Sequence, residues 1–102
     1  MNIEVSPKEY ERMLNWNDAM LYCSLLVIDD KCDWRLPTKE ELNYIYNSED
    51  DLECDYYWSS TEYNSNNAYG QGMAYGGQNM SYGGQYYYGK NYTGYVRAVR
   101  TI

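Results

Sequence analysis

Histidine and phenylalanine are absent from this chain of 102 residues, and cysteine and proline are scarce, with three and two residues. Without histidine, no Ser–His or Cys–His pair can activate a nucleophile. Cys23, Cys32 and Cys54 form no CxxC pair, and a zinc site would need a fourth ligand. We read them as small buried hydrophobic residues, with at least one free thiol. We therefore expect no enzyme activity, no cofactor and no bound metal.

Long apolar runs are missing too. A membrane-spanning helix needs about 20 consecutive apolar residues, and no stretch of this sequence approaches that composition. Residues 1–15 hold five charged side chains where a signal peptide would hold an apolar run. We predict neither membrane insertion nor a signal peptide.

Acidic residues are absent after Glu62. All fifteen lie between Glu4 and Glu62, so residues 1–62, with five basic side chains, carry a formal charge of −10, while residues 63–102 carry +3. The acidic part would repel a phosphate backbone, which argues against a nucleic-acid partner. A protein that imitates nucleic acid is a minor alternative. Acidic side chains at positions 50 and 51 could hold a cation, but an acidic loop is more often simply solvated.

Tyrosine takes the place of phenylalanine. The chain has fifteen tyrosines and three tryptophans, and nine of the tyrosines, all eight glycines and five asparagines lie in residues 63–95. Within this tyrosine tract, a seven-residue near repeat runs from Met73 to Asn79 and again from Met80 to Tyr86. Tyrosine offers contact area together with a hydroxyl for a partner, and the Gly-Gly pairs predict hairpin turns. A disordered low-complexity tract is the alternative.

The remaining sequence predicts a frame of helices and short strands. Ile3–Val5 alternates as a short strand, and residues 7–13 are expected to form an irregular link rather than a helical turn. Asn15 is the predicted N-cap of a helix that runs to about Ile28. The apolar face expected for this helix comprises Trp16, Ala19, Met20, Cys23, Leu26 and Val27.

A capping box predicts the start of a second helix. Residues 34–37 should be extended, because the proline at position 37 disfavours helix at the residue before it. Thr38 is the predicted N-cap, with Glu41 three residues later. The helix should end near Asn47, and its expected buried stripe is Leu42, Ile45 and Tyr46.

Two further stretches, 56–61 and 95–100, are predicted strands. Ser59 and Ser60 follow Trp58 in the first of them. Short hydroxyl side chains at such positions favour tight packing with hydrogen bonds to the backbone. Because no base is available to activate them, we expect a structural role.

Four spaced blocks together resemble the Lcl C-terminal domain family, named after the C-terminal domain of a collagen-like bacterial adhesin. The blocks are Trp16-x-x-Ala19-x-x-x-Cys23, Asp33–Leu42, Tyr57–Glu62 and Val96–Arg100, so the resemblance covers nearly the whole chain. It implies an α+β, C-type-lectin-like fold of the formylglycine-generating-enzyme type. Two helices would pack on a small twisted antiparallel sheet with a tyrosine- and glycine-rich C-terminal hairpin region, in one domain over 1–102. Enzymes on this fold use cysteines or metal-binding histidines, so the resemblance here implies a binding module.

Relatives on this fold include the variable proteins of diversity-generating retroelements, in which directed mutagenesis places Tyr, Asn, Ser and Gly at exposed positions near the C-terminus. The tyrosine tract is similar in composition and position. We therefore expect a non-catalytic domain that binds a protein or glycan on a cell surface, as a variable receptor-binding protein or an adhesin. The expected ligand-binding residues are Tyr75, Asn79, Tyr82, Tyr86, Tyr87, Tyr88, Asn91 and Tyr92.

A phage particle or bacterial cell surface is the favoured location, and assembly as a homo-oligomer stays open. The alternative function is that of a small acidic effector in the cytoplasm, encoded by a phage, that inhibits a host protein. This alternative rests on the charge asymmetry and would use the acidic loop around residues 50–55.

Overall fold

A five-stranded sheet with strand order β2–β6–β3–β4–β5 organises the molecule. Neighbouring strands run antiparallel except β3 and β6, which are parallel. This computed structural model describes residues 1–53, 55–72 and 84–102. The strands are β2 (Arg12–Asn15), β3 (Tyr56–Glu62), β4 (Asn67–Gly72), β5 (Gln85–Gly89) and β6 (Thr93–Val96).

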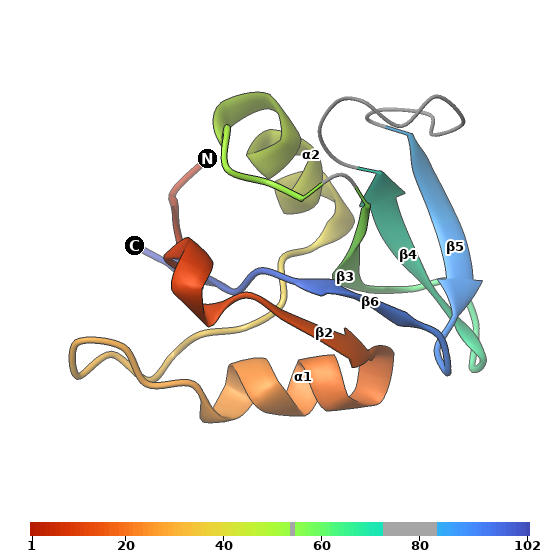
Figure 1. Cartoon of the computed structure of the whole chain (residues 1–102), viewed down its shortest axis with the longest axis horizontal. Helices are drawn as coiled ribbons and strands as arrows, with labels where there is room; N and C mark the ends of the chain where they lie inside the picture. The colour runs from red at the N-terminus through yellow and green to blue at the C-terminus, as the bar shows by residue number, and fades with distance from the viewer. Residues whose placement is uncertain (54, 73–83) are drawn as a thin grey trace.

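One helix covers each face of this sheet (Figure 1). Helix α1 (Trp16–Leu25) packs on one face and α2 (Lys39–Ser48) on the other. The core on the α1 side contains Trp16, Ala19, Cys23, Leu26, Ile28, Trp34, Leu36, Trp58, Ala68, Val96 and Ala98. The core on the α2 side contains Leu42, Ile45, Tyr57 and Val99. The predicted α+β architecture, with two helices on a small sheet, is confirmed.

Adjacent side chains of the central strand β3 pack in the two different cores. Side chains alternate along a strand, so Tyr57 belongs to the α2 side and Trp58 to the α1 side, and both are fully buried. The indole of Trp58 donates to the carbonyl of Leu14 at 3.0 Å, and that of Trp16 donates to the carbonyl of Ser59 at 2.8 Å. Both large rings therefore bury their area without leaving a polar N–H unsatisfied.

The predicted helix starts are present. The side chain of Asn15 accepts a hydrogen bond from the backbone N–H of Asp18 at 2.9 Å. Thr38 and Glu41 form the reciprocal capping box, and the Glu41 carboxylate also accepts two hydrogen bonds from Arg35, at 2.6 and 2.8 Å. This pair links the extended segment before α2 to its first turn.

The chain ends meet beside the main sheet. Strand β1 (Ile3–Val5) pairs antiparallel with β7 (Val99–Thr101), so the two termini lie close together (Figure 1). The single strand predicted over 95–100 is wrong, because β6 ends at Val96 and β7 begins at Val99. The chain breaks there because Arg97 is 2% exposed and points inward to the carbonyl of Ser6 and the carboxylate of Asp51.

Three other predictions need correction. Residues 7–13 hold a 3₁₀ turn over Lys8–Tyr10 followed by the start of β2, rather than an irregular link. Helix α1 ends at Leu25, three residues before the predicted Ile28. Met20 and Val27 are 38% and 60% exposed, because the α1-side core lies under the face that carries the other four predicted residues.

Candidate ligand-binding surface

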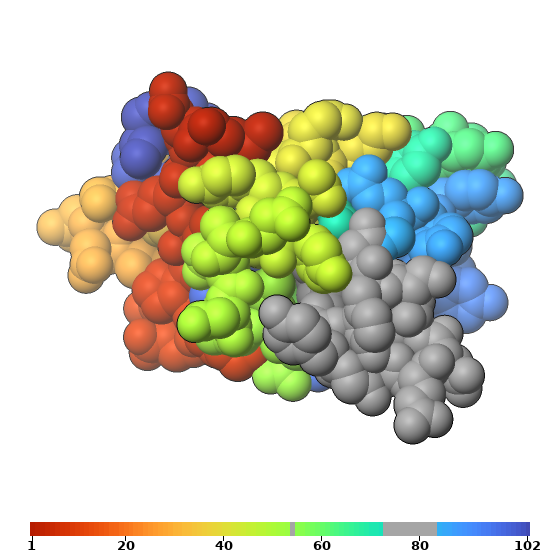
Figure 2. All heavy atoms as spheres, turned by 90° about the horizontal axis from the view of Figure 1, so that it is seen from above, coloured from red at the N-terminus to blue at the C-terminus, as the bar shows by residue number. Residues whose placement is uncertain are grey.

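Strand β5 is the outer strand of the sheet and carries three consecutive tyrosines. It pairs only with β4, with Tyr69 opposite Tyr87 and Gly70 opposite Tyr86. Tyr86 and Tyr87 are 51% and 52% exposed. The strand lies at the end of the molecule away from the chain termini (Figure 2). About half of each of these two tyrosine side chains therefore remains accessible to a partner among the residues that the structure describes.

Tyr87 takes part in a three-ring cluster on the α2 side of the sheet. Its ring stacks on that of Tyr63, with centroids 4.0 Å apart and planes 4° from parallel, and Tyr63 meets Tyr69 edge-on at 5.8 Å. The ammonium of Lys39, at the start of α2, lies 4.3 Å from the centre of the Tyr69 ring. We call Tyr63, Tyr69 and Tyr87 the Tyr63 cluster. Its contacts fix the orientation of rings that are still half exposed.

Tyr88 points to the opposite face and joins the hydrophobic core. Its ring stacks on Tyr56 at 4.0 Å and meets Trp58 edge-on at 6.3 Å. Burial raises the pKa of Tyr88, and burial also raises the pKa of Tyr56 to about 12. Tyr56 therefore stays protonated and donates its hydroxyl to the carbonyl of Thr93 at 2.7 Å. Of the three adjacent tyrosines, Tyr88 anchors the strand, while Tyr86 and Tyr87 remain half exposed.

The other predicted site residues fall in two groups. Asn91 and Tyr92 lie in the turn between β5 and β6, where both are exposed, Tyr92 to 64%. Tyr75, Asn79 and Tyr82 lie outside the described residues. The described part of the predicted site is thus one outer strand and the turn that follows it.

Sequence reasoning missed Tyr63, Tyr69 and Lys39 as partners of this surface. Tyr63 and Tyr69 belong to the tyrosine tract, but they precede the repeats and are separated from Tyr87 by more than fifteen residues. The signal that could have found Tyr69 is strand pairing, because the antiparallel register of β4 against β5 places it opposite Tyr87. Lys39 carries no such signal, because only the packing of α2 on the sheet brings it near.

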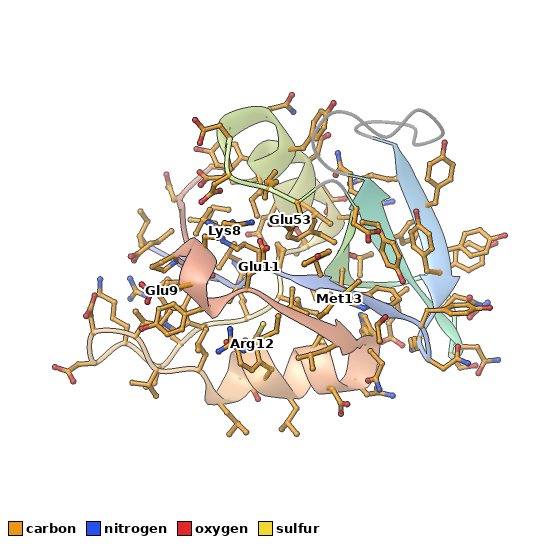
Figure 3. All side chains as sticks on the ribbon, in the orientation of Figure 1. Lys8, Glu9, Glu11, Arg12, Met13 and Glu53 are labelled. Atoms are coloured by element: carbon orange, nitrogen blue, oxygen red, sulfur yellow. The ribbon has the colours of Figure 1, made fainter. Side chains whose placement is uncertain are left out.

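A second cluster of polar side chains surrounds Arg97. Its guanidinium contacts Asp51 at 3.0 Å and Glu11 at 3.3 Å, and the hydroxyl of Tyr57 donates to Glu11 at 2.7 Å. Lys8 bridges Glu11 and Glu53, and these three side chains converge in Figure 3. Burial alone would lower the pKa of Arg97, but the hydrogen-bonded Asp51 raises it overall. The charged groups satisfy one another, so this cluster stabilises the frame.

Ser59 has the structural role expected of it. Its hydroxyl donates to the carbonyl of Tyr69 at 2.7 Å and accepts from the backbone N–H of Thr61 at 3.1 Å. The register of β3 against β4 shifts between Trp58 and Glu62, so these side-chain bonds replace part of the strand ladder.

Neither a metal cluster nor a spanning helix occurs in the part of the chain that the structure describes. Over residues 1–53, 55–72 and 84–102, no three acidic or cysteine side chains are grouped to hold an ion. Within the same ranges, no helix has the length and apolar composition required to cross a membrane. Cys23 is buried as predicted, which raises its thiol pKa to about 12. The prediction of burial is wrong for Cys32, which is exposed, and Cys54 lies outside the described residues.

Comparison with known proteins identifies the family. A search of curated proteins finds no match. The family model of the Lcl C-terminal domain matches residues 5–100. The match spans both helices and every strand of the main sheet, including the β5 strand with its exposed tyrosines. The chain therefore belongs to the Lcl C-terminal domain family.

Proposed function

We propose that this chain is a non-catalytic recognition domain that binds a protein or glycan through the tyrosines of β5 and the Tyr63 cluster. The observation that carries the proposal is the stacked, half-exposed pair of Tyr87, on the outer strand β5, and Tyr63, which directly follows β3. The family is consistent with a ligand-binding domain. In this proposal the domain is displayed on a phage particle or bacterial surface, as a variable receptor-binding protein or an adhesin.

The physical support is the low cost of ordering these rings. A tyrosine has few side-chain torsions, so it contributes contact area on binding with little loss of entropy. In the Tyr63 cluster, stacking has already removed much of that freedom before any partner arrives. The hydroxyls supply hydrogen bonds, and the ring faces can stack on sugars or on apolar side chains.

The test is a binding screen of the purified domain against glycan and cell-surface protein arrays. The double variant Tyr86→Ala/Tyr87→Ala should lose any hit while it keeps the far-ultraviolet circular dichroism of the parent and a cooperative unfolding transition, with a loss of stability no larger than the about 0.5–1.5 kcal/mol of the stack. The matched control is Tyr44→Ala, which removes a 40% exposed ring from α2, on a different element. We expect that control to retain the hit.

Two results would overturn the proposal. One is a ligand whose affinity is unchanged in the double variant, because binding would then use another surface. The other is unfolding of the double variant, because the rings would then serve packing rather than recognition. A catalytic turnover by the purified domain, abolished by changing one polar residue, would overturn the non-catalytic part.

The acidic effector remains the alternative, and no contact among the described residues favours it. Asp51 and Glu53 form ion pairs with Arg97 and Lys8, and the carboxylate of Asp55 accepts from the backbone N–H of Tyr56. These acids stabilise the frame, so reversing their charge would change stability as well as any surface. A pull-down from cytosol with the intact domain is the direct test of this alternative.

A further inference from the structure

A polar pocket of about 500 Å³ lies where the start of α1 meets two turns of the sheet. Its walls are the first residues of α1, the turn between β3 and β4, and the turn between β5 and β6. The side chains that line it are Asn15, Asn17, Ser65, Asn66, Lys90 and Asn91. Pockets of this volume are typical of small-molecule sites.

Lys90 joins the three walls and holds them in place. Its backbone N–H donates to the carbonyl of Asn66 at 2.9 Å, and its carbonyl accepts from the N–H of Trp16 at 3.1 Å. Its ammonium donates to the carbonyl of Ser65 at 3.1 Å. The pocket is therefore formed before any ligand binds, because each wall is bonded to the same residue.

The positive charge of Lys90 is already engaged. The ammonium lies 2.7 Å from the carboxylate of Glu62 and 4.3 Å from the centre of the Trp16 ring, in addition to its bond to Ser65. A lysine has three N–H donors, and these partners occupy all of its directions. The lining therefore has no charge to offer an anionic ligand.

The amides of the pocket, in contrast, are available. The side chains of Asn17, Asn66 and Asn91 and the hydroxyl of Ser65 form no hydrogen bond with the part of the chain that the structure describes. Asn15 uses its oxygen to cap α1, which leaves its NH₂ group as a donor. Each amide combines a donor and an acceptor, and so does each hydroxyl of a sugar.

We propose that this pocket binds one residue of a neutral saccharide. Uncharged amides that line one pocket match the paired donors and acceptors of vicinal hydroxyls. The inference rests on the proposed function in that it names a ligand class for the recognition domain. It places that ligand in a pocket beside the tyrosines of β5 rather than on them.

The test is a nuclear magnetic resonance titration of the ¹⁵N-labelled domain with the methyl glycosides of glucose, galactose, mannose and N-acetylglucosamine. Single-site sugar binding is weak, so each probe is taken to about 50 mM, above the ~1 mM range of such contacts. We expect at least one glycoside to shift the side-chain amide signals of Asn66 and Asn91. Methyl glucuronide, the charged counterpart, should bind no more tightly than the glucoside.

Three variants separate the pocket from the tyrosine surface. The double variant Asn66→Ala/Asn91→Ala should weaken glycoside binding by about tenfold or more, since each lost hydrogen bond contributes a few-fold. Asn47→Ala removes an exposed amide from α2 and should have no effect. Tyr86→Ala/Tyr87→Ala should also retain glycoside binding, although the proposed function requires it to lose the array ligand.

Three results would overturn the proposal that this pocket binds a neutral saccharide. No shift with any glycoside would exclude neutral saccharides, and preference for the glucuronide would show that the charge is not neutralised. Glycoside binding that is lost in the tyrosine variant but kept in the asparagine variant would move the sugar to β5. That last result would leave the proposed function standing while the pocket inference fails.

Discussion

The rings of Tyr63 and Tyr87 stack 4.0 Å apart although one begins the loop after β3 and the other lies mid-way along β5. The contact closes the outer hairpin on the α2 side, where no backbone pairing joins these two residues. It is also the contact by which a solvent-facing ring is held in one orientation.

The Tyr63–Tyr87 stack should appear as an energetic coupling. In a double-mutant cycle with Tyr63→Ala and Tyr87→Ala, we expect a coupling of about 0.5–1.5 kcal/mol in the free energy of unfolding. Urea denaturation of the four proteins measures it. The pair Tyr63 and Tyr92, which do not touch in the structure, should be additive. Equal coupling in both cycles would mean that the stack contributes nothing specific.

Arg97 should be the most costly arginine to remove. Its side chain is 2% exposed and pairs with Glu11, which is 6% exposed, and with Asp51, which is 42% exposed. Arg97→Met therefore removes one of the two cationic partners of the buried Glu11 carboxylate and leaves it with Lys8 alone. We expect a loss of about 3 kcal/mol or more in the free energy of unfolding, measured by urea denaturation. Lys31→Met is the control, because the Lys31 side chain is 44% exposed in a 3.5 Å ion pair and should cost under about 0.5 kcal/mol. Similar losses for the two variants would contradict this assignment.

Stability should fall in acid through Glu41. The guanidinium of Arg35 holds the pKa of Glu41 below its ordinary value of 4.5 in the folded protein. A lowered folded-state pKa stabilises the fold above pH 4.5, and this contribution is lost as the pH falls through the folded value. Glu41→Gln should therefore flatten the dependence of the unfolding free energy on pH below about 4.5.

The comparison for Glu41 is its neighbour Glu40, which is exposed and outside the capping box. Urea denaturation from about pH 7 to pH 3 on Glu41→Gln, Glu40→Gln and the parent measures the effect. The Glu40 variant should follow the parent curve. A Glu41 variant that is as acid-sensitive as the parent would refute the role of this carboxylate.

Gly94 should tolerate no side chain. A Cβ at this position would lie 2.6 Å from the ring of Tyr56 and 3.0 Å from the indole nitrogen of Trp58. The Tyr56 ring cannot move aside, because it stacks on Tyr88 and donates to Thr93. We expect Gly94→Ala to cost about 1–3 kcal/mol in unfolding free energy, followed by tryptophan fluorescence during denaturation. Thr93→Ala, at the exposed neighbouring position, should cost less, and the reverse order would contradict the packing described.

The helix starts were predictable because their signals are local. Asn15 and the Thr38–Glu41 pair bond within the first turn of their own helices, so three or four residues contain the whole interaction. The end of α2 was predicted within one residue, at Asn47 against the observed Ser48. Local chemistry determined these boundaries with little influence from tertiary packing.

The elements that depend on distant residues were not predictable. Strand β2 lacks clear alternation and exists because Arg12–Asn15 pairs with Thr93–Val96. The break between β6 and β7 follows from Arg97 reaching Ser6 and Asp51, which are 91 and 46 residues away in sequence. Predictions about the site divide in the same way. The exposure of Tyr86 and Tyr87 agrees with composition, whereas the anchoring of Tyr88 needs the rings of Tyr56 and Trp58.

Two side chains, at positions 85 and 88, attach strand β5 to the frame. Gln85 donates to the side chain of Gln71, and Tyr88 packs on Tyr56, whereas Tyr86 and Tyr87 leave half of their surface in solvent. The anchored positions hold the register of the strand whatever side chains stand at the other two. A library randomised at positions 86 and 87 alone would then change the binding specificity of the domain while its backbone stays the same.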